Sequence, residues 1–216
     1  MKKKIALFTI ISCLVSLIPM FVGLILWDKL PEQMATSFGF DGTVNGYSSK
    51  LFAVVGLPMI LVCVNIFCII ATMADPRRKN ISDMVLALVL SIIPACSLFG
   101  GVIMYQEHLG YSISAQILAP LFLGIMFVVL GSILPKCKQN YTVGIKLPWT
   151  LNSEKNWDKT HAFGGRVWTI GGIVMIVLGL LGFEIAAFAT IFILVLIPTV
   201  YSYVYYRRYE RCNKNS

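Results

Sequence analysis

Three side chains with acid–base chemistry stand at helical spacing in the second half of the chain. Glu154, Asp158 and His161 occupy positions i, i+4 and i+7, which places them along one side of a helix. Two carboxylates and an imidazole can act as general acid and base or bind a metal ion. The interleaved Lys155 and Lys159 instead favour an exposed salt-bridge network. We therefore predict that the chain is not an enzyme and has no catalytic residue, no metal and no cofactor.

These side chains belong to the longest polar interval of an otherwise apolar chain, residues 140–168. Pro148 disfavours helical geometry at the residue before it, so residues 144–150 are predicted to form a non-helical strip, with Trp149 at the membrane surface. Asn152 or Ser153 can then accept the first free N–H groups of a short helix.

One face of this predicted helix carries Trp157, His161, Gly164 and Trp168. One interpretation is an amphipathic helix in the membrane interface, with tryptophan anchors and with lysines that face lipid phosphates. The other is an ordered surface, in which hydrogen-bonding side chains face a partner or turn back into the helix bundle. The hydrogen-bonding side chains in question are Asn140, Thr150, Thr160 and His161.

Composition assigns the chain to the integral membrane proteins. Of its 216 residues 57% are hydrophobic and only 13% are charged, and its mean hydropathy is +0.79, outside the range of soluble domains. Six apolar runs are long enough to cross a bilayer. They are residues 5–27, 51–73, 84–105, 114–134, 167–183 and 185–206. We predict an all-α bundle of six transmembrane helices.

The distribution of charge predicts the orientation. With a cytoplasmic amino terminus, 16 of the 18 basic residues fall in segments on the cytoplasmic side, as the positive-inside rule requires. Both termini are then cytoplasmic in a multi-pass protein of the cell membrane. The net charge of +8 is explained by topology, and we predict the lipid bilayer as a partner and no direct contact with nucleic acid.

The spans divide the chain into four predicted parts. Residues 1–73 hold the first two helices and an outer loop, 28–50, and residues 74–134 hold helices three and four. Residues 135–166 form a cytoplasmic segment, called the signature segment below, and residues 167–216 hold helices five and six with a basic tail. The predicted spans contain no Asp, Glu, Lys, Arg or His, which disfavours ion-coupled transport.

The outer loop is polar and rich in turn-forming residues. Phe40, Asp41 and Gly42 predict a turn. The sequence leaves open whether the segment is a hydrated connection or a binding loop. Its candidate functional residues are Leu30, Pro31, Glu32, Phe38, Gly39, Asp41, Gly42 and Lys50.

The signature segment carries a resemblance to a known family. It contains Asn-x-x-x-Gly-Ile-Lys-x-Pro-Trp-Thr-Leu, then a tryptophan, a Thr-His pair and a glycine before an apolar helix. This order resembles the SdpI family of membrane proteins, although Lys146 stands where many relatives have arginine. The outer loop is similar to an amino-terminal Leu-Pro module found in many of those relatives. The candidate functional surface that the resemblance implies consists of Asn140, Gly144, Lys146, Pro148, Trp149, Thr150, Trp157, Thr160, His161 and Gly164.

The resemblance implies immunity to a secreted, membrane-active peptide toxin of the sporulation-delaying type. The implied partners are a peptide toxin outside the cell and a transcriptional repressor inside it. The alternative is a transporter-like or uncharacterised membrane protein that has the same fold and no toxin role.

Overall fold

The computed structural model describes residues 2–39, 43–106 and 115–211. Within these residues six helical stretches are long and apolar enough to cross a membrane. They are Ile5–Ile25, Phe52–Met73, Asp83–Tyr105, Ala115–Lys136, Glu154–Leu180 and Glu184–Tyr209. The predicted multi-pass helical fold is confirmed. The chain forms two compact units, residues 1–73 with 86–115 and residues 74–85 with 116–216.

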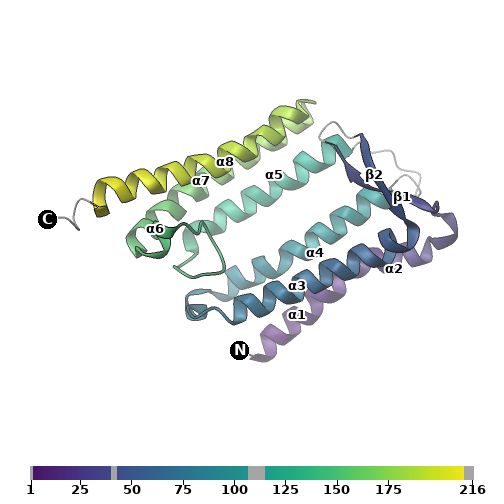
Figure 1. Cartoon of the computed structure of the whole chain (residues 1–216), viewed down its shortest axis with the longest axis horizontal. Coiled ribbons are helices and arrows are strands. Elements are labelled where there is room, and N and C mark those ends of the chain that lie inside the picture. Colours follow the sequence, from purple (N-terminus) through teal and green to yellow (C-terminus); the bar gives the residue numbers. More distant parts are fainter. Residues whose placement is uncertain (1, 40–42, 107–114, 212–216) are drawn as a thin grey trace. The chain divides into compact units, whose positions relative to one another are not determined.

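The first unit contains three spans. The first span is broken into α1 (Lys2–Ser16) and α2 (Ile18–Ile25), with Pro19 at the start of α2 (Figure 1). The second span begins as a π-helical turn, η2 (Phe52–Gly56), and continues as α3 (Leu57–Met73). Most of α4 (Asp83–Tyr105) supplies the third.

A short polar chain crosses this unit. Asn65 of α3 donates to the Ser12 hydroxyl of α1, at 2.6 Å, and Ser12 donates to the Leu90 carbonyl of α4, at 2.8 Å. The Asn65 side chain is 1% exposed, and a buried amide without a partner would be costly in an apolar interior. The chain therefore joins three helices through polar groups inside an apolar unit.

The outer segment is not the open loop that its composition suggested. After a 3₁₀ turn, η1 (Trp27–Lys29), it forms an antiparallel hairpin of β1 (Gln33–Phe38) and β2 (Val44–Ser49). Gln33 pairs with Ser49 and Phe38 pairs with Val44, with a register irregularity between them. The turn predicted at 40–42 lies outside the described residues. The two strands add a small sheet to the predicted all-α fold.

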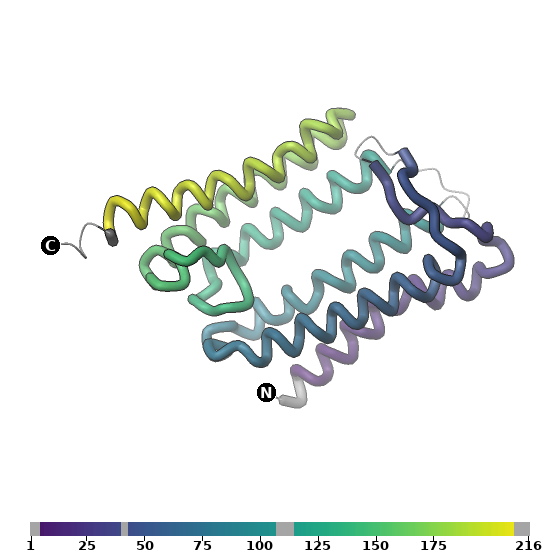
Figure 2. The backbone as a smooth tube through the Cα atoms, viewed as in Figure 1, coloured from purple at the N-terminus to yellow at the C-terminus, as the bar shows by residue number. Residues whose placement is uncertain are grey.

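The second unit contains the remaining three spans and the signature segment. Its elements are η3 (Arg78–Asn80), α5 (Ala115–Ile133, most of it in this unit), η5 (Leu134–Lys136), α6 (Pro148–Leu151), α7 (Glu154–Leu180), α8 (Glu184–Tyr205) and η6 (Tyr206–Arg211). Helices α7 and α8 pack along each other, and the chain before α6 folds back against the start of α7 (Figure 2). A Cβ atom at Gly172 of α7 would lie 2.6 Å from the Gly124 carbonyl oxygen of α5. Small residues thus permit the close crossing of these two helices.

The helix α7 differs from the prediction. A short surface helix and a separate span from residue 167 were expected, but a single helix of 27 residues runs from Glu154 to Leu180. At 1.5 Å per residue it is about 40 Å long, against roughly 30 Å for the hydrocarbon core. Its first turns are therefore free to carry polar side chains outside that core.

Candidate functional site

Local capping builds the frame of the signature segment. The Ser153 hydroxyl accepts the Asn156 N–H at 3.1 Å, so the predicted cap at the start of α7 is confirmed. The Thr150 hydroxyl accepts the Leu147 N–H at 2.9 Å and lies 2.9 Å from the Ile145 carbonyl oxygen, to which it can donate. Both turns are therefore closed by side chains close to them in sequence.

His161 lies at the centre of the segment and is fully buried. Its Nε2 accepts the Ile145 N–H at 3.0 Å, and its Nδ1 lies 2.8 Å from the Trp157 carbonyl oxygen. Because a backbone N–H can only donate, Nε2 carries the lone pair and Nδ1 carries the proton. His161 is therefore a neutral ring that holds the strip before α6 against α7.

Trp157 packs directly on this histidine. The two rings are stacked with centroids 4.0 Å apart, and the indole N–H donates to the Cys137 carbonyl at 2.7 Å. Trp157 has no exposed surface. The interpretation of Trp157 as a lipid anchor is therefore wrong, because a tertiary contact with the chain near residue 137 covers it.

Two glycines allow the strip to approach the helix. Gly144 has φ +122°, and a Cβ atom there would collide with Nε2 of His161. A Cβ atom at Gly164 would lie 2.7 Å from the Ile145 side chain. Both candidate glycines thus have a steric role in this packing.

Asn140 and Asp75 organise the chain before the strip. The Asn140 side-chain oxygen accepts the N–H groups of Thr142 and Val143 at 2.9 and 2.6 Å. Asp75 accepts the Tyr141 N–H at 2.9 Å, and it also accepts the hydroxyl of Thr142. Burial alone would raise the pKa of Asp75, but these bonds and the Arg77 N–H hold that pKa below its usual value.

Gln139 ties the same loop to α6. Its amide donates to the carbonyls of Thr150 and Leu151 at 2.7 and 3.0 Å, and its side-chain oxygen accepts from the Arg77 guanidinium. The guanidinium lies 5.0 Å from the centre of the Tyr141 ring. The loop after α3 is therefore part of the site, through Asp75 and Arg77.

A second buried network joins α7 to α8. The Asn156 side-chain oxygen accepts from Thr160 and from Ser202, both at 2.9 Å. Ser202 also accepts the Trp149 indole N–H at 2.7 Å, while the Trp149 ring packs against Tyr203. Trp149 is thus half-buried between α6 and α8, and its place at the membrane surface stays a prediction.

The structure does not assemble the acid–base cluster considered from spacing. Glu154 and Asp158 are exposed, whereas His161 is buried beneath the strip. Among the described residues no group of three or more His, Cys, Asp or Glu side chains could hold a metal ion.

The exposed rim of the segment is distinct from its buried frame. Of the candidate residues, Lys146 and Pro148 are exposed, whereas the Asn140, Thr150, Thr160 and His161 side chains are turned inward. The structure thus decides between the two directions that the sequence left open for these groups. We call Tyr141, Lys146, Pro148, Lys155 and Lys159 the exposed rim; the acidic Glu154 and Asp158 are exposed beside its last two lysines.

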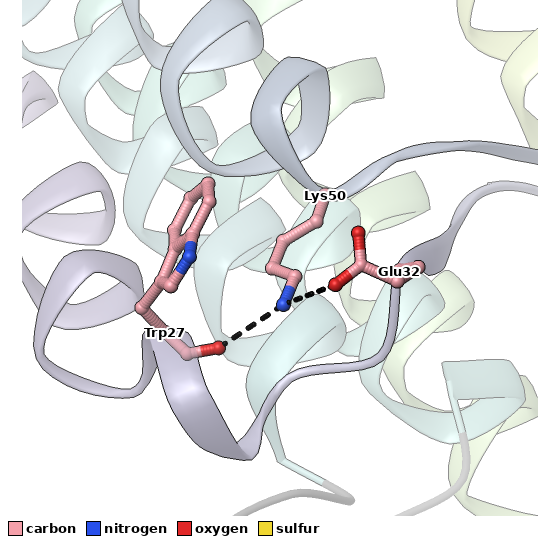
Figure 3. A network of polar contacts seen from close by, with 3 residues as sticks. All are labelled: Trp27, Glu32 and Lys50. Carbon is pink, nitrogen blue, oxygen red and sulfur yellow. Dashed lines mark hydrogen bonds and ion pairs between the residues drawn. The ribbon is translucent and has the colours of Figure 1, made fainter.

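The candidate residues of the outer hairpin also divide into buried and exposed side chains. Lys50 is 7% exposed. Its amine bonds Glu32 at 2.8 Å and the Trp27 carbonyl at 3.3 Å, and it lies 5.1 Å from the centre of the Trp27 ring (Figure 3). Leu30 is buried in the core cluster of the first unit, while Pro31 and Phe38 are exposed.

The Gly39 N–H donates to the Thr43 carbonyl at 2.8 Å, which continues the pairing of the hairpin beyond β1. Asp41 and Gly42 lie outside the described residues.

Sequence reasoning missed Asp75, Arg77, Gln139 and Ser202. One signal for Asp75 was available in the sequence. It is an acidic residue next to the basic run 77–79, and neither solubility nor topology requires an acidic residue there. Nothing local distinguished Gln139 or Ser202, because their partners are distant in sequence.

The sequence was compared with those of known proteins and protein families. Residues 136–202 match the model of the SdpI/YfhL protein family, and residues 14–62 match a domain of unknown function, DUF1648. The chain is 24% identical over 207 residues to "Immunity protein SdpI" of Bacillus subtilis (strain 168), covering 92% of this chain and 96% of that protein. No solved structure matches. The matched family segment begins beside Cys137 and ends at Ser202, so it contains both buried networks except for the Asp75 loop. The chain is a multi-pass membrane protein, and the resemblance of its signature segment to the SdpI family is confirmed.

Proposed function

We propose that this protein is an immunity protein of the cell membrane, which protects the cell against a secreted, membrane-active peptide toxin. The observation that carries the proposal is the likeness to Immunity protein SdpI, which extends over 92% of the chain. The likeness covers the outer hairpin as well as the signature segment. Both faces that such a protein would need are therefore within the compared length.

The well-packed structure of the signature segment supports a function beyond connecting two spans. A linker does not need to bury a tryptophan, a histidine and two asparagines, since burying polar groups is costly unless each is paired. Here the pairing is extensive, and it holds the rim of Tyr141, Lys146 and Pro148 in one arrangement.

The two faces have different roles in this proposal. With both termini cytoplasmic, the rim of the signature segment faces the cell interior. There its lysines attract anionic lipid headgroups, each contributing about 1 kcal/mol near the surface, and the ordered surface recruits a repressor protein. The hairpin faces outward and meets the toxin. The activity is binding and signalling, with no catalytic step.

A protection assay tests the proposal. A sensitive strain without its own immunity protein expresses the chain and is challenged with a sporulation-delaying-type toxin, while survival and membrane potential are measured. We expect the wild type and Lys155→Gln to protect, because Lys155 is one exposed charge among several. The double variant Trp149→Ala, Trp157→Ala should not protect at equal membrane abundance on a blot. Failure of the wild type to protect at normal abundance would refute the proposal, and full protection by the double variant would move the functional surface to the hairpin.

A further inference from the structure

A cavity of about 290 Å³ lies in the first unit beneath the outer hairpin. Its walls come from α2, α3 and α4, and strand β1 covers it. The lining includes two prolines and a glycine, whose short side chains leave space unfilled; they are Pro19, Pro58 and Gly100. Apart from its chain neighbours and the backbone of its own helix, no heavy atom of the described residues lies within 4 Å of the position that a Gly100 Cβ would take. The cavity is therefore a real gap in side-chain packing.

The lining is unsuited to water. Among the described lining residues, only Thr36 and Ser97 carry a hydroxyl group. The Thr36 hydroxyl already bonds Ser48 at 2.8 Å, and the Ser97 hydroxyl already donates to the Ser16 carbonyl at 2.7 Å. A buried water needs two to four polar partners, and a dry apolar cavity binds an apolar guest instead.

The cavity is continuous with the surface that faces the bilayer. Ile60 of α3 lines it and is itself 49% exposed, and the adjacent Met59 is 45% exposed. On the covering strand Phe38 lines the cavity and is 36% exposed. Because these apolar side chains are shared by the cavity and the membrane-facing surface, hydrocarbon can enter from the side.

We propose that this cavity binds one acyl chain of a membrane lipid, in the leaflet on the hairpin's side. One water molecule occupies ~30 Å³ in the liquid, so the cavity is roughly ten times as large as one water molecule. Its volume therefore suits a segment of an acyl chain. A peptide backbone would bring N–H and C=O groups that this lining leaves unpaired, at high cost in an apolar site.

The energetic reason is packing, because a lipid tail is already in hydrocarbon and gains nothing from leaving water. Filling the gap restores the dispersion contacts that an empty cavity forfeits. The hairpin is held in place without the lipid, since Met34 is buried in the core and Lys50 binds Glu32 and the Trp27 carbonyl. The acyl chain thus packs under a covering strand that is already in position.

Photo-crosslinking in nanodiscs tests this site. The probe is phosphatidylglycerol with a diazirine in one acyl chain, added at increasing mole fraction, and adducts are mapped by mass spectrometry. We expect adducts at the lining residues Leu61 and Ile103 to saturate, whereas adducts at Ile193 of α8, a 52% exposed position outside the cavity, rise in proportion to the probe.

Substitution at Gly100 supplies the matched comparison. Gly100→Ala should lower the lining adducts partly and Gly100→Leu several-fold, since the added carbons occupy the gap. Val102→Leu, on the same helix at a 53% exposed position, should leave the adducts unchanged. The proposal would be overturned if the lining adducts rose in proportion to the probe and were unchanged in Gly100→Leu. That result would show that the lining contacts only ordinary surface lipid.

Discussion

Replacing His161 separates a structural role of the signature segment from a chemical one. In His161→Phe an aromatic ring of similar size is kept against Trp157, but the acceptor for the Ile145 N–H is lost. A buried donor left without a partner costs about 1–3 kcal/mol. His161→Ala also removes the stacked ring and leaves a cavity, for a total of about 3–5 kcal/mol. The strip before α6 should loosen in both variants, more in the second.

The measurement is thermal unfolding in nanodiscs followed by tryptophan fluorescence, with limited proteolysis between residues 138 and 153. For a chain of this length each kcal/mol corresponds to about 2–4 °C in Tm. We expect the order wild type, His161→Phe, His161→Ala in falling Tm, with Lys159→Gln equal to the wild type because Lys159 is exposed on the same helix. Protection in the toxin assay should fall in the same order.

Two results would refute this reasoning. If His161→Ala kept the wild-type Tm and protease resistance, the two hydrogen bonds and the stack would not hold the strip. If His161→Phe kept the stability but lost protection completely, the imidazole would act on a ligand or proton instead of on the fold.

Three further predictions follow from the same geometry. Gly144→Ala should destabilise the segment by about 1–3 kcal/mol, because its φ is positive and its Cβ would meet His161; the same unfolding assay measures this. The low pKa of Asp75 should stabilise the fold above the usual carboxyl pKa of 3.8 and lose that contribution as pH falls through its lower folded pKa; Asp75→Asn should flatten this acid-dependent fall in Tm, and a wild-type Tm that is flat there would contradict it. A cysteine at the exposed Asn152, in a variant free of other cysteines, should react with an impermeant thiol reagent only after the cells are opened. Labelling in intact cells would show that the signature segment lies outside the cell and would contradict the predicted topology.

The sequence by itself determined the membrane architecture. Apolar runs of bilayer length have one stable outcome in lipid, the helix, because its backbone hydrogen bonds are satisfied within the segment. For the same local reason the cap at Ser153 and the extended backbone of Leu147 before Pro148 were predictable, because each depends on neighbouring residues. The expectation that the strip stays non-helical through Thr150 is wrong, since α6 begins at Pro148.

Tertiary structure decided what the polar side chains do. Trp157 has the sequence context of an interfacial anchor, yet the Cys137 carbonyl twenty residues away pairs with its indole. Spacing placed His161 on one helix face with Trp157, Gly164 and Trp168, but its neutral tautomer depends on the Ile145 N–H. Asp75 entered the site through contacts more than sixty residues along the chain.

The outer hairpin shows the same limit. Glycine and polar residues made the segment resemble a loop, while burial of Leu30 and Met34 and the Lys50 contacts hold it as two strands against the helices. A local pattern determines which backbone geometry a residue accepts. Which distant group covers or pairs its side chain depends on how the chain folds back, and no local pattern contains that information.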